Sequence, residues 1–486
     1  MGILTLLLLM PLFGAALIAA IPDDFGRLIR SIAVGAGLLT LVIAWGLLAG
    51  FDLQNSGLQY FEMHRWNPRM GTSFAFGVDG FSLPMVLLAT LLTFVAILAS
   101  GNIRQPSKIY YLLMLVLESA MLGVFMAQDW ALFYVFWELT LIPLFFLIDR
   151  WGGANRHGAA LNFFLYTMGG SVFLLVSLLI LFDTVPGHTF AMADIAAGAT
   201  SLPEQTQIFI FLGFLVGFGV KMPVFPIHGW LPIAHVEAPS PVSILLSGVL
   251  LKMGSYGLIR VTGILPDGAV ALQGVLIALA LVSLIYGGLL AWRQRDLKAM
   301  IAYSSVSHMG VVLVGIAALN VSGLTGAVMQ MVAHGLVAGA LFLLIGLLYE
   351  RTHTRDINDY SSLVRVMPRF AVLTTLTFVA AVSLPGTVGF IAELHALIGG
   401  FQRWGWLVVV LSLGVMISAA YAIRSVGRLF TGPVRPRMLH IQDLSGVELI
   451  AASVLTTGIV LLGLFPAPAL HLMSASVTRF SSMFAL

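Results

Sequence analysis

The stretch GVKMPVFPIHGWLPIAH, residues 219–235, places a lysine, three prolines and two histidines between apolar segments. Pro223 and Pro226 lack backbone N–H groups and clash with carbonyl groups one turn earlier, so a helix that carries Lys221 is expected to break there. Within a membrane, the freed carbonyl groups are tolerated only where they face protein or internal water. The stretch therefore predicts a broken membrane helix, with Lys221 beside a water-accessible break.

Two other interpretations of this stretch are less favoured. An exposed proline-rich loop containing PVFP disagrees with the apolar flanks. A metal site formed by His228, His235 and Glu237 has a spacing that matches no standard zinc pattern.

The composition supports a membrane protein. Of the 486 residues, 59% are hydrophobic and 9% are charged, whereas soluble domains carry roughly 25% charged residues. We predict an all-α polytopic membrane protein, with residues 1–486 as a single membrane domain and no soluble catalytic domain. Because the chain has no cysteine, it cannot hold disulfides, cysteine nucleophiles or thiolate-bound iron–sulfur clusters.

About fourteen membrane-spanning helices are predicted, each near the 20 residues that cross a bilayer. The first lacks the features of a removable signal peptide and is expected to remain. The run from 370 to 402 contains SLPGTVGF and is treated as one broken span. The predicted spans are 3–21, 29–50, 79–100, 109–127, 130–149, 160–183, 206–222, 242–263, 269–291, 300–319, 323–349, 370–402, 405–427 and 447–470.

The distribution of basic residues predicts the orientation, because Lys and Arg accumulate in cytoplasmic connections. Seventeen of the 24 Lys and Arg residues fall in the odd-numbered connections. These are Arg27, Arg30, Arg104, Lys108, Arg150, Arg156, Arg293, Arg295, Lys298, Arg351, Arg355, Arg365, Arg369, Arg424, Arg428, Arg435 and Arg437. The other side has Arg65, Arg69, Arg260, Arg403 and Arg479. Both chain termini are therefore expected outside.

The two remaining cations, Lys221 and Lys252, fall in or beside apolar segments, where a central charge costs about 2.5 to 3.5 kcal/mol. Each ionisable residue in a span could also have a purely structural role. A histidine could be a buried, hydrogen-bonded core residue, and Lys252 could extend its ammonium group to the membrane interface. Seven such groups in one bundle instead favour an ion path or proton relay. The other five are Glu118, Glu138, His308, His334 and Glu393.

A second predicted break resembles the first. SLPGTVGFIAELHALIG, residues 383–399, has Pro385 and Gly386 followed about two turns later by Glu393. The two broken spans are five apart, and five is odd, so two repeats of opposite orientation are predicted, as in secondary transporters. The predicted repeats are residues 109–263 and 269–427.

Five long motifs resemble the antiporter-like subunits of respiratory complex I, and the resemblance covers nearly the whole chain. Within this family, the chain is similar to subunit M of NADH-quinone oxidoreductase, since residues after 470 leave no room for the long lateral helix of subunit L. Glu393 agrees, because subunits L and N carry lysine there. The motifs are FGVDGFSLPMV (76–86), FYVFWELTLIPLFFLI (133–148), VKMPVFPIHGWLPIAHVEAPSPVSILLSGVLLKMGSYGLIR (220–260), DLKAMIAYSSVSHMGVVLVGI (296–316) and GAVMQMVAHGLVAGALFLLIGLLYERTHTRDI (326–357).

The resemblance implies a proton-translocation role for six residues. Glu138 would pair with Lys221, Lys252 would be the central connecting lysine, His308 and His334 the relay histidines, and Glu393 the terminal acid. Three positions depart from the family pattern: Ile233 replaces a common Asp, Ala392 replaces a frequent Gly, and His395 is added. These departures concern the proton uptake route near residue 233 and the surroundings of Glu393.

The resemblance further implies a proton-translocating subunit of an NADH (or related donor):quinone oxidoreductase in the bacterial inner membrane. FMN, iron–sulfur clusters and quinone are then expected in partner subunits and no cofactor in this chain. The expected neighbours are L-like and N-like membrane subunits, and no nucleic acid is expected. Two alternatives remain open: a subunit of a multi-subunit Na⁺/H⁺ antiporter, which shares the lysine motifs, and a subunit of a membrane-bound hydrogenase, which would use the same membrane mechanism with a different electron donor. Neighbouring genes would distinguish the three.

Overall fold

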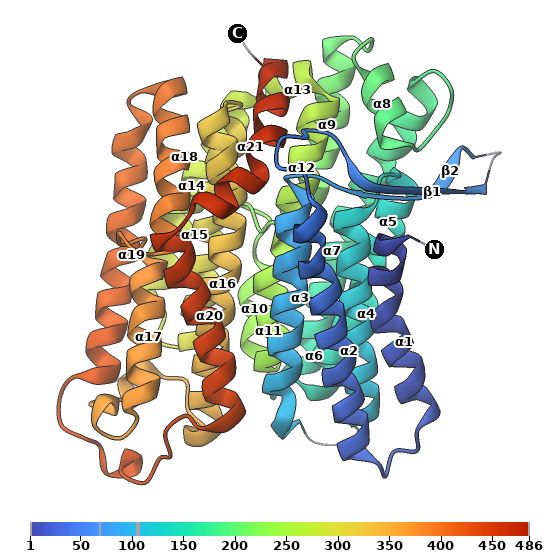
Figure 1. The fold of residues 1–486 in the computed structure, drawn as a ribbon. Helices are drawn as coiled ribbons and strands as arrows, with labels where there is room; N and C mark the ends of the chain where they lie inside the picture. The colour runs from blue at the N-terminus through green and yellow to red at the C-terminus, as the bar shows by residue number, and fades with distance from the viewer. Residues whose placement is uncertain (1, 68–69, 104–106, 485–486) are drawn as a thin grey trace.

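The structure is a computed structural model that describes residues 2–67, 70–103 and 107–484. The chain forms a bundle of helices that run mostly in one direction, with connections gathered at the two ends (Figure 1). Arg69 and Arg104, which contribute to the predicted orientation, lie outside the described residues.

The elements follow the predicted spans closely. The first half contains α1 (Ile3–Ala20), α2 (Gly26–Gly46), α3 (Ser82–Ala99), α4 (Ser107–Met126), α5 (Trp130–Leu139), α6 (Leu141–Trp151), α7 (Arg156–Thr184), α9 (Glu204–Lys221), α10 (Trp230–Glu237), α11 (Ser240–Leu245), the π-helical turn η3 (Leu246–Leu250) and α12 (Leu251–Ile264). The second half contains α14 (Gln273–Arg293), α15 (Leu297–Ala317), α16 (Val321–Thr352), α17 (Pro368–Ala381), α18 (Val388–Trp404), α19 (Leu407–Phe430) and α20 (Gly446–Leu464). Shorter elements are α8 (Met192–Ala199), α13 (Pro266–Ala271), α21 (Ala467–Ser481) and the strands β1 (Gln59–Asn67) and β2 (Thr72–Val78).

The all-α polytopic class is confirmed. In the described part of the chain, twelve helices are long and apolar enough to cross a membrane, with α5–α6 and α11–α12 each counted as one. The interrupted pairs α9–α10 and α17–α18 are not among these twelve, although they coincide with the two predicted broken spans. The total of fourteen spans and the inverted relation of the two repeats stay predictions.

The first break lies where the prolines predict it. α9 ends at Lys221 and α10 begins at Trp230, with Pro223 and Pro226 in the irregular segment between them. The indole N–H of Trp230 donates a hydrogen bond of 2.8 Å to the Val220 carbonyl. The Val220 carbonyl next to the break is thus hydrogen-bonded by another protein group. Such a bond is needed because apolar surroundings offer no water to satisfy a free backbone carbonyl.

The second break separates α17 from α18. Gly386 has a φ of +94°, a left-handed conformation that glycine adopts without steric cost. α18 then begins at Val388 and carries Glu393 between one and two turns further on. The sequence pattern of proline, glycine and acid therefore corresponds to a real interruption.

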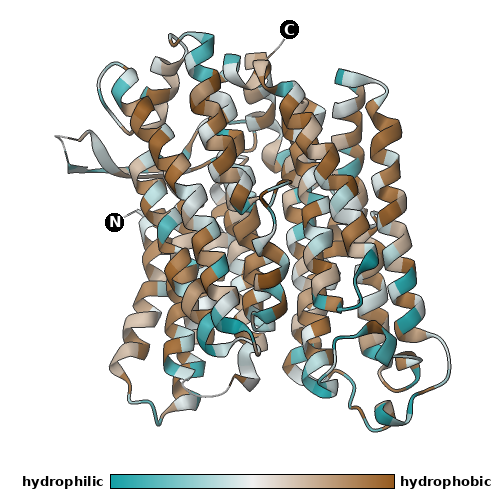
Figure 2. Cartoon of the chain, turned by 180° about the vertical axis from the view of Figure 1, so that it is seen from behind, coloured by the Kyte–Doolittle hydropathy of each residue, from teal (hydrophilic) through white to brown (hydrophobic). Residues whose placement is uncertain are grey.

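The interior of the bundle is formed by three membrane segments. An 18-residue apolar stretch of the span Ser240–Ile264 is completely buried, and the corresponding stretches of α15 and α16 are 94% buried, whereas that of α20 is 33% buried. The first three carry Lys252, His308 and His334, respectively. Hydrophobic helix shafts with hydrophilic segments toward the ends are visible in Figure 2.

A β-hairpin between α2 and α3 was not predicted. β1 and β2 pair in antiparallel register, with Met63 opposite Ala75. The carboxylate of Glu62 on β1 accepts hydrogen bonds from the backbone N–H groups of Leu4 (2.7 Å) and Thr5 (3.2 Å). Glu62 thereby satisfies donors that the first turn of α1 cannot pair internally.

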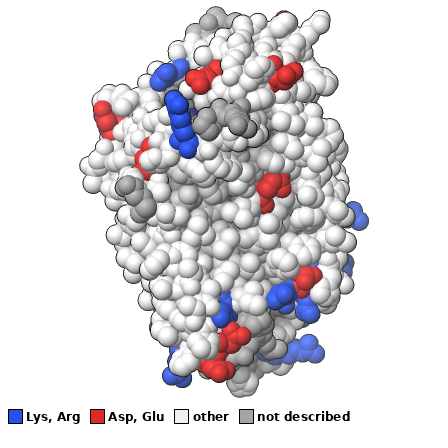
Figure 3. Space-filling view, turned by 90° about the vertical axis from the view of Figure 1, so that its right-hand side faces the viewer, with Lys and Arg blue, Asp and Glu red and all other residues white. Residues whose placement is uncertain are grey.

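The two ends of the bundle differ in their connections. The connections 21–25 and 431–445 lie at the lower end in Figure 1, and the C-terminus lies near the upper end. We call the end with connections 21–25, 294–296 and 353–367 the basic end. On the face drawn in Figure 3, charged side chains gather toward the two ends, and most of the surface between them is uncharged.

Candidate functional site

Lys221 is buried at the end of α9, next to the irregular segment. Its Nζ donates to Thr140 Oγ1 at 2.8 Å and to the Trp137 carbonyl at 3.4 Å. The ammonium group also lies 4.1 Å from the centroid of the Trp137 ring, a favourable cation–π geometry. The junction between α5 and α6 therefore holds the Lys221 ammonium group beside the first break.

Glu138 lies beside this group but makes no direct ion pair with it. Among the described residues, no Lys221–Glu138 contact falls within 4.0 Å, although Glu138 does interact electrostatically with Lys221. Glu138 is half-buried, and no described residue forms a hydrogen bond with its Oε1. The structure thus places Thr140, rather than the predicted glutamate, in contact with the Lys221 ammonium.

Lys252 occupies the centre of the bundle, directly after the π-helical turn η3. Its Nζ donates to the Ser247 carbonyl at 2.6 Å and lies 2.6 Å from Nδ1 of His334. A π-helical turn leaves backbone carbonyls without their usual α-helical partners, and such turns are frequent at functional sites. Here the turn provides the oxygen that holds Lys252 against His334.

His308 and Glu393 continue the same polar row toward α18. The rings of His334 and His308 have centroids 5.5 Å apart. His308 Nδ1 lies 3.7 Å from Glu393 Oε1, and its Nε2 lies 3.4 Å from the Tyr421 hydroxyl. Lys252, His334, His308 and Glu393 therefore form a continuous row of ionisable side chains from α12 to α18.

A small cavity adjoins the last two members of this row. His308, Glu393 and Ser418 are among the side chains that line it. Its volume of about 10 Å³ is near the minimum that one water centre requires. A single water could therefore bridge His308 and Glu393, whose 3.7 Å separation is longer than a hydrogen bond.

The Lys221 group and the Lys252 row are separate. No hydrogen bond joins them in the described part of the chain. Their helices nevertheless pack backbone to backbone, since a Cβ on Gly254 would lie 2.6 Å from the Phe218 carbonyl oxygen. Proton transfer between the two lysines would need water or another side chain.

His235 is the side chain that the sequence interpretation missed. It is fully buried on α10 and stacked on Phe342 with ring centroids 4.4 Å apart. Neither of its ring nitrogens has a hydrogen-bond partner among the described residues. His235 interacts electrostatically with Lys252 and Lys298. The sequence did contain a signal, namely a second histidine seven residues after His228. His235 was considered only as a metal ligand and was therefore not included in the relay.

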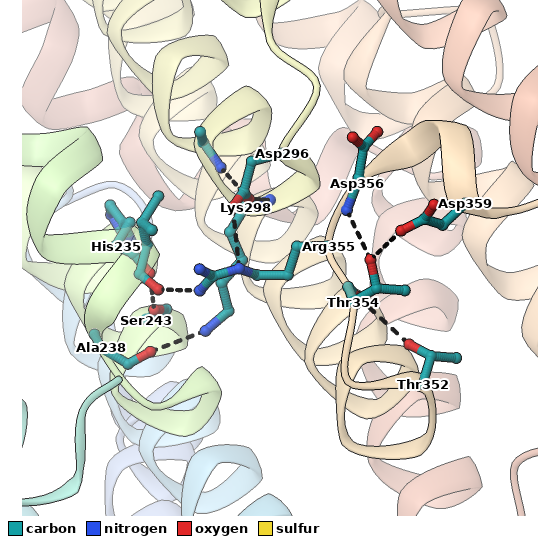
Figure 4. Close-up of polar contacts among 12 residues, drawn as sticks. His235, Ala238, Ser243, Asp296, Lys298, Thr352, Thr354, Arg355, Asp356 and Asp359 are labelled. Atoms are coloured by element: carbon teal, nitrogen blue, oxygen red, sulfur yellow. Dashed lines mark hydrogen bonds and ion pairs between the residues drawn. The ribbon is translucent and has the colours of Figure 1, made fainter. Parts of the chain in front are cut away.

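Lys298 connects this histidine to the basic end of the bundle. Its buried Nζ donates to the Ala238 carbonyl at 2.9 Å (Figure 4). Nearby, Arg355 forms an ion pair with Asp296 (3.0 Å) and donates to the Val236 carbonyl at 2.5 Å. The end of α10 is thus joined to the start of α15 by a polar cluster that reaches the connections of the basic end.

The remaining sequence candidates lie apart from the row. Glu118 is fully buried on α4, and within the described part of the chain neither of its carboxylate oxygens has a hydrogen-bond partner. Ile233 is 45% exposed, while Ala392 is buried. His395 Nδ1 is 2.8 Å from the carbonyl oxygen of Ile391 on its own helix. No group of three or more His, Asp or Glu side chains suited to a metal ion occurs among the described residues.

Comparison with known proteins identifies the family. A family profile described as "NADH:quinone oxidoreductase/Mrp antiporter, TM" matches residues 127–418, which include all six residues of the predicted relay. The chain belongs to this NADH:quinone oxidoreductase/Mrp antiporter family. The resemblance inferred from the motifs is therefore confirmed.

Several relatives in this family match over almost their full length. A "NADH-quinone oxidoreductase subunit M" of Rhodobacter capsulatus is 39% identical, covering 98% of this chain and 96% of the relative. A "NAD(P)H-quinone oxidoreductase chain 4 2" of Thermosynechococcus vestitus is 40% identical, covering 95% and 89%. A chain in the structure of respiratory complex I from Thermus thermophilus with bound NADH has a TM-score of 0.88 and 32% identity, covering 98% and 99%.

The contact between Thr140 and Lys221 gives a direct prediction. Thr140→Val keeps the shape of the side chain but removes the acceptor for a charged donor, a contact worth about 1.5–3 kcal/mol. We expect proton pumping by the assembled complex to fall several-fold, measured by quenching of a pH-sensitive dye in vesicles. Thr167→Val is the matched control, because that buried hydroxyl donates only to carbonyls of its own helix. Equal pumping by both variants would refute a role for Thr140.

Proposed function

We propose that this chain is the M-type proton-translocating membrane subunit of an NADH (or related donor):quinone oxidoreductase. The continuous row Lys252–His334–His308–Glu393 inside an apolar bundle is the observation that carries this proposal. Buried charges of this kind usually line ion paths or proton relays. The names and full-length similarity of the relatives support the redox complex rather than a free-standing transporter.

The mechanism uses the two separate groups as a switch and a relay. Lys221, next to Glu138, would load a proton at the first break and release it toward Lys252 when the charge of Glu138 is moved or neutralised. Two unit charges about 4 Å apart interact by roughly 4 kcal/mol at an effective dielectric constant near 20, which is an upper limit for Lys221 and Glu138 because they lie further apart than 4.0 Å. Moving one charge through 100 mV costs about 2.3 kcal/mol. One such switch therefore has the scale needed to work against a membrane potential.

The two proposed repeats share the relay between them. The first repeat, residues 109–263, would contain Glu138, Lys221 and Lys252, and the second, residues 269–427, would contain His308, His334 and Glu393. The row of Lys252 therefore crosses from one repeat to the other at the contact between Lys252 and His334. Each repeat has one interrupted helix. We propose that the repeats are inverted, so that water reaches the two breaks from opposite sides of the membrane.

The redox chemistry is proposed to occur in other subunits. FMN, iron–sulfur clusters and quinone would be bound by partners, and this chain would bind none of them. Its proposed neighbours are L-like and N-like membrane subunits in the bacterial inner membrane. Electron transfer elsewhere would then alter the charge near Glu138 and drive the relay.

One experiment separates this function from the alternatives. The complex is purified through a tag on this chain and reconstituted in vesicles with NADH and a quinone. We expect redox-driven proton movement and co-purification of flavin and iron–sulfur subunits. Recovery of only small antiporter subunits with cation/proton exchange activity, or of a nickel hydrogenase, would overturn the proposal in favour of one of the two alternatives.

The proposed orientation places both termini outside and the basic end in the cytoplasm. Reporter fusions after residues 295 and 358, in two connections of the basic end, are expected to be active only with a cytoplasmic reporter such as green fluorescent protein. Alkaline phosphatase at the same positions is expected to be inactive. The reverse pattern would show that the bundle is inserted the other way round.

A further inference from the structure

A large cavity lies under the hairpin, at the end opposite the basic end. Its volume is about 710 Å³, and its lining includes Phe61 of β1, Gln128, Trp130, Arg260, Ala193 of α8 and Phe480 of α21. We call it the hairpin vestibule. Several buried donors in its lining lack partners in the structure, namely Trp130 Nε1 and the Nε and Nη2 of Arg260. Donors of this kind are normally satisfied by water, so the vestibule is expected to be hydrated as far as Arg260.

An ion pair closes the inner end of the vestibule. Arg260 Nη1 lies 2.7 Å from Asp79 Oδ2. Asp79 Oδ1 accepts hydrogen bonds from the backbone N–H groups of Phe81 and Ser82, both at 3.0 Å. The ion pair and these two backbone hydrogen bonds hold Arg260 in a fixed position.

Behind this pair, α12 leads directly to the relay. Lys252, Tyr256 and Arg260 are spaced four residues apart and share one helix face, so Lys252 lies roughly 12 Å along the helix from Arg260. The guanidinium carbon of Arg260 lies 4.9 Å from the ring centroid of Tyr256 and 5.8 Å from that of Phe81. Any route from the vestibule to Lys252 along this face passes first the guanidinium group and then Tyr256.

The chemistry of these two groups interrupts a proton wire. A chain of hydrogen bonds transfers protons only through groups that both accept and donate. Guanidinium has five donors, no acceptor, and does not lose its proton in proteins. The Tyr256 hydroxyl donates its proton to the Phe125 carbonyl at 3.1 Å, and the partners of Lys252 are the Ser247 carbonyl and His334, so the phenol proton is not shared with Lys252.

We propose that Arg260, positioned by Asp79, is a proton stopper that separates the hairpin vestibule from the central Lys252. Such a stopper is needed because the vestibule brings outside water to about two helical turns from the relay. Protons returning from the positive side would otherwise dissipate the gradient. The inference rests on the proposed function and orientation, and it adds a positioning residue that takes no part in forward proton transfer.

The test measures passive proton permeability of vesicles containing the assembled complex, after an imposed pH jump and without NADH. The variant carries Arg260→Gln and Asp79→Asn together. The net charge of the pair stays zero in this variant, and the amide oxygen of Asn at residue 79 can still accept hydrogen bonds at the start of α3. Gln at residue 260 carries an amide that both donates and accepts hydrogen bonds. We expect a several-fold rise in permeability, an unchanged rate of quinone reduction, and fewer protons pumped per electron pair.

Two controls separate the stopper from a packing role. Arg260→Lys keeps Asp79 unchanged, and a carboxylate in contact favours the protonated ammonium, which only donates. Unlike Lys221 and Lys252, which have no carboxylate in contact among the described residues, this lysine is expected to stay charged, so these vesicles are expected to stay as tight as the parent. Arg479→Gln changes an exposed cation at the rim of the same vestibule and is expected to have no effect. The proposal is overturned if vesicles with the double variant have the proton permeability of the parent, or if vesicles with Arg260→Lys leak as much as those with the double variant. Because the assay uses no electron transfer, it is informative even if redox-driven pumping by the parent is absent.

A second measurement applies if the double variant does not assemble. The chain has no cysteine, so single cysteines can be labelled with a membrane-impermeant maleimide from outside. Ala193→Cys in the vestibule is expected to react readily, and Ser255→Cys, buried between Lys252 and Tyr256, is expected to stay unlabelled. Rapid labelling at residue 255, or none at residue 193, would contradict a hydrated vestibule with a closed inner end.

Discussion

Replacing Lys221 by alanine is expected to reduce proton pumping by about tenfold or more, which corresponds to roughly 1.4 kcal/mol or more in the limiting step. In the described structure, Thr140 and Trp137 hold one charged side chain of α9–α10 at the first break, and this side chain is Lys221. Without it, the α5–α6 junction no longer holds a group that can load a proton. Coupled quinone reduction should also fall, while the complex still assembles. Dye quenching and NADH oxidation in the same vesicles provide both values.

Glu138→Ala is expected to have an effect of similar size. Glu138 does not touch Lys221 within 4.0 Å, so its proposed role is electrostatic and does not depend on direct contact. Lys108→Ala is the matched control, because Lys108 forms an ion pair of 3.6 Å with the largely exposed Asp23. Exposed pairs of this kind contribute about 0–1 kcal/mol. Parental pumping by Glu138→Ala in an assembled complex would exclude the coupled pair.

Replacing Glu393 by glutamine is expected to impair pumping strongly. Glutamine keeps the size and hydrogen bonding of the side chain but cannot carry a proton from His308 to the cavity beside it. Asp at residue 393 should retain part of the activity, because it keeps a titratable group on a shorter side chain. Proton pumping per electron pair in reconstituted complex measures both variants.

His395 is the control for an alternative exit through α18. It is partly exposed and its ring contacts a carbonyl of its own helix, so His395→Gln alone should leave pumping unchanged. Combining it with Glu393→Gln should add nothing. A loss seen only in the double variant would indicate redundant exits, and parental pumping by Glu393→Gln would make Glu393 a structural residue.

The prolines, glycines and apolar runs were sufficient to predict most of the helical fold. The breaks at Pro223 and Pro226 and at Pro385 and Gly386 could be located because proline lacks a donor and glycine tolerates positive φ, both of which are local backbone properties. The membrane spans could be located because hydrocarbon requires long apolar helices. The hairpin was missed because its 51–78 segment has no comparable requirement, and it is held partly by Glu62 capping α1.

The sequence by itself therefore determined the class of protein, the breaks and the set of ionisable residues inside the membrane. Only the tertiary structure decided which of these residues meet. It joined Lys252, His334, His308 and Glu393 and left Glu118 apart. It also put Thr140, rather than Glu138, against the Lys221 ammonium. The reason is physical: helix periodicity fixes the depth and face of a residue, but contacts between helices depend on their rotation and on close approaches such as Gly254 against Phe218, which no local pattern encodes.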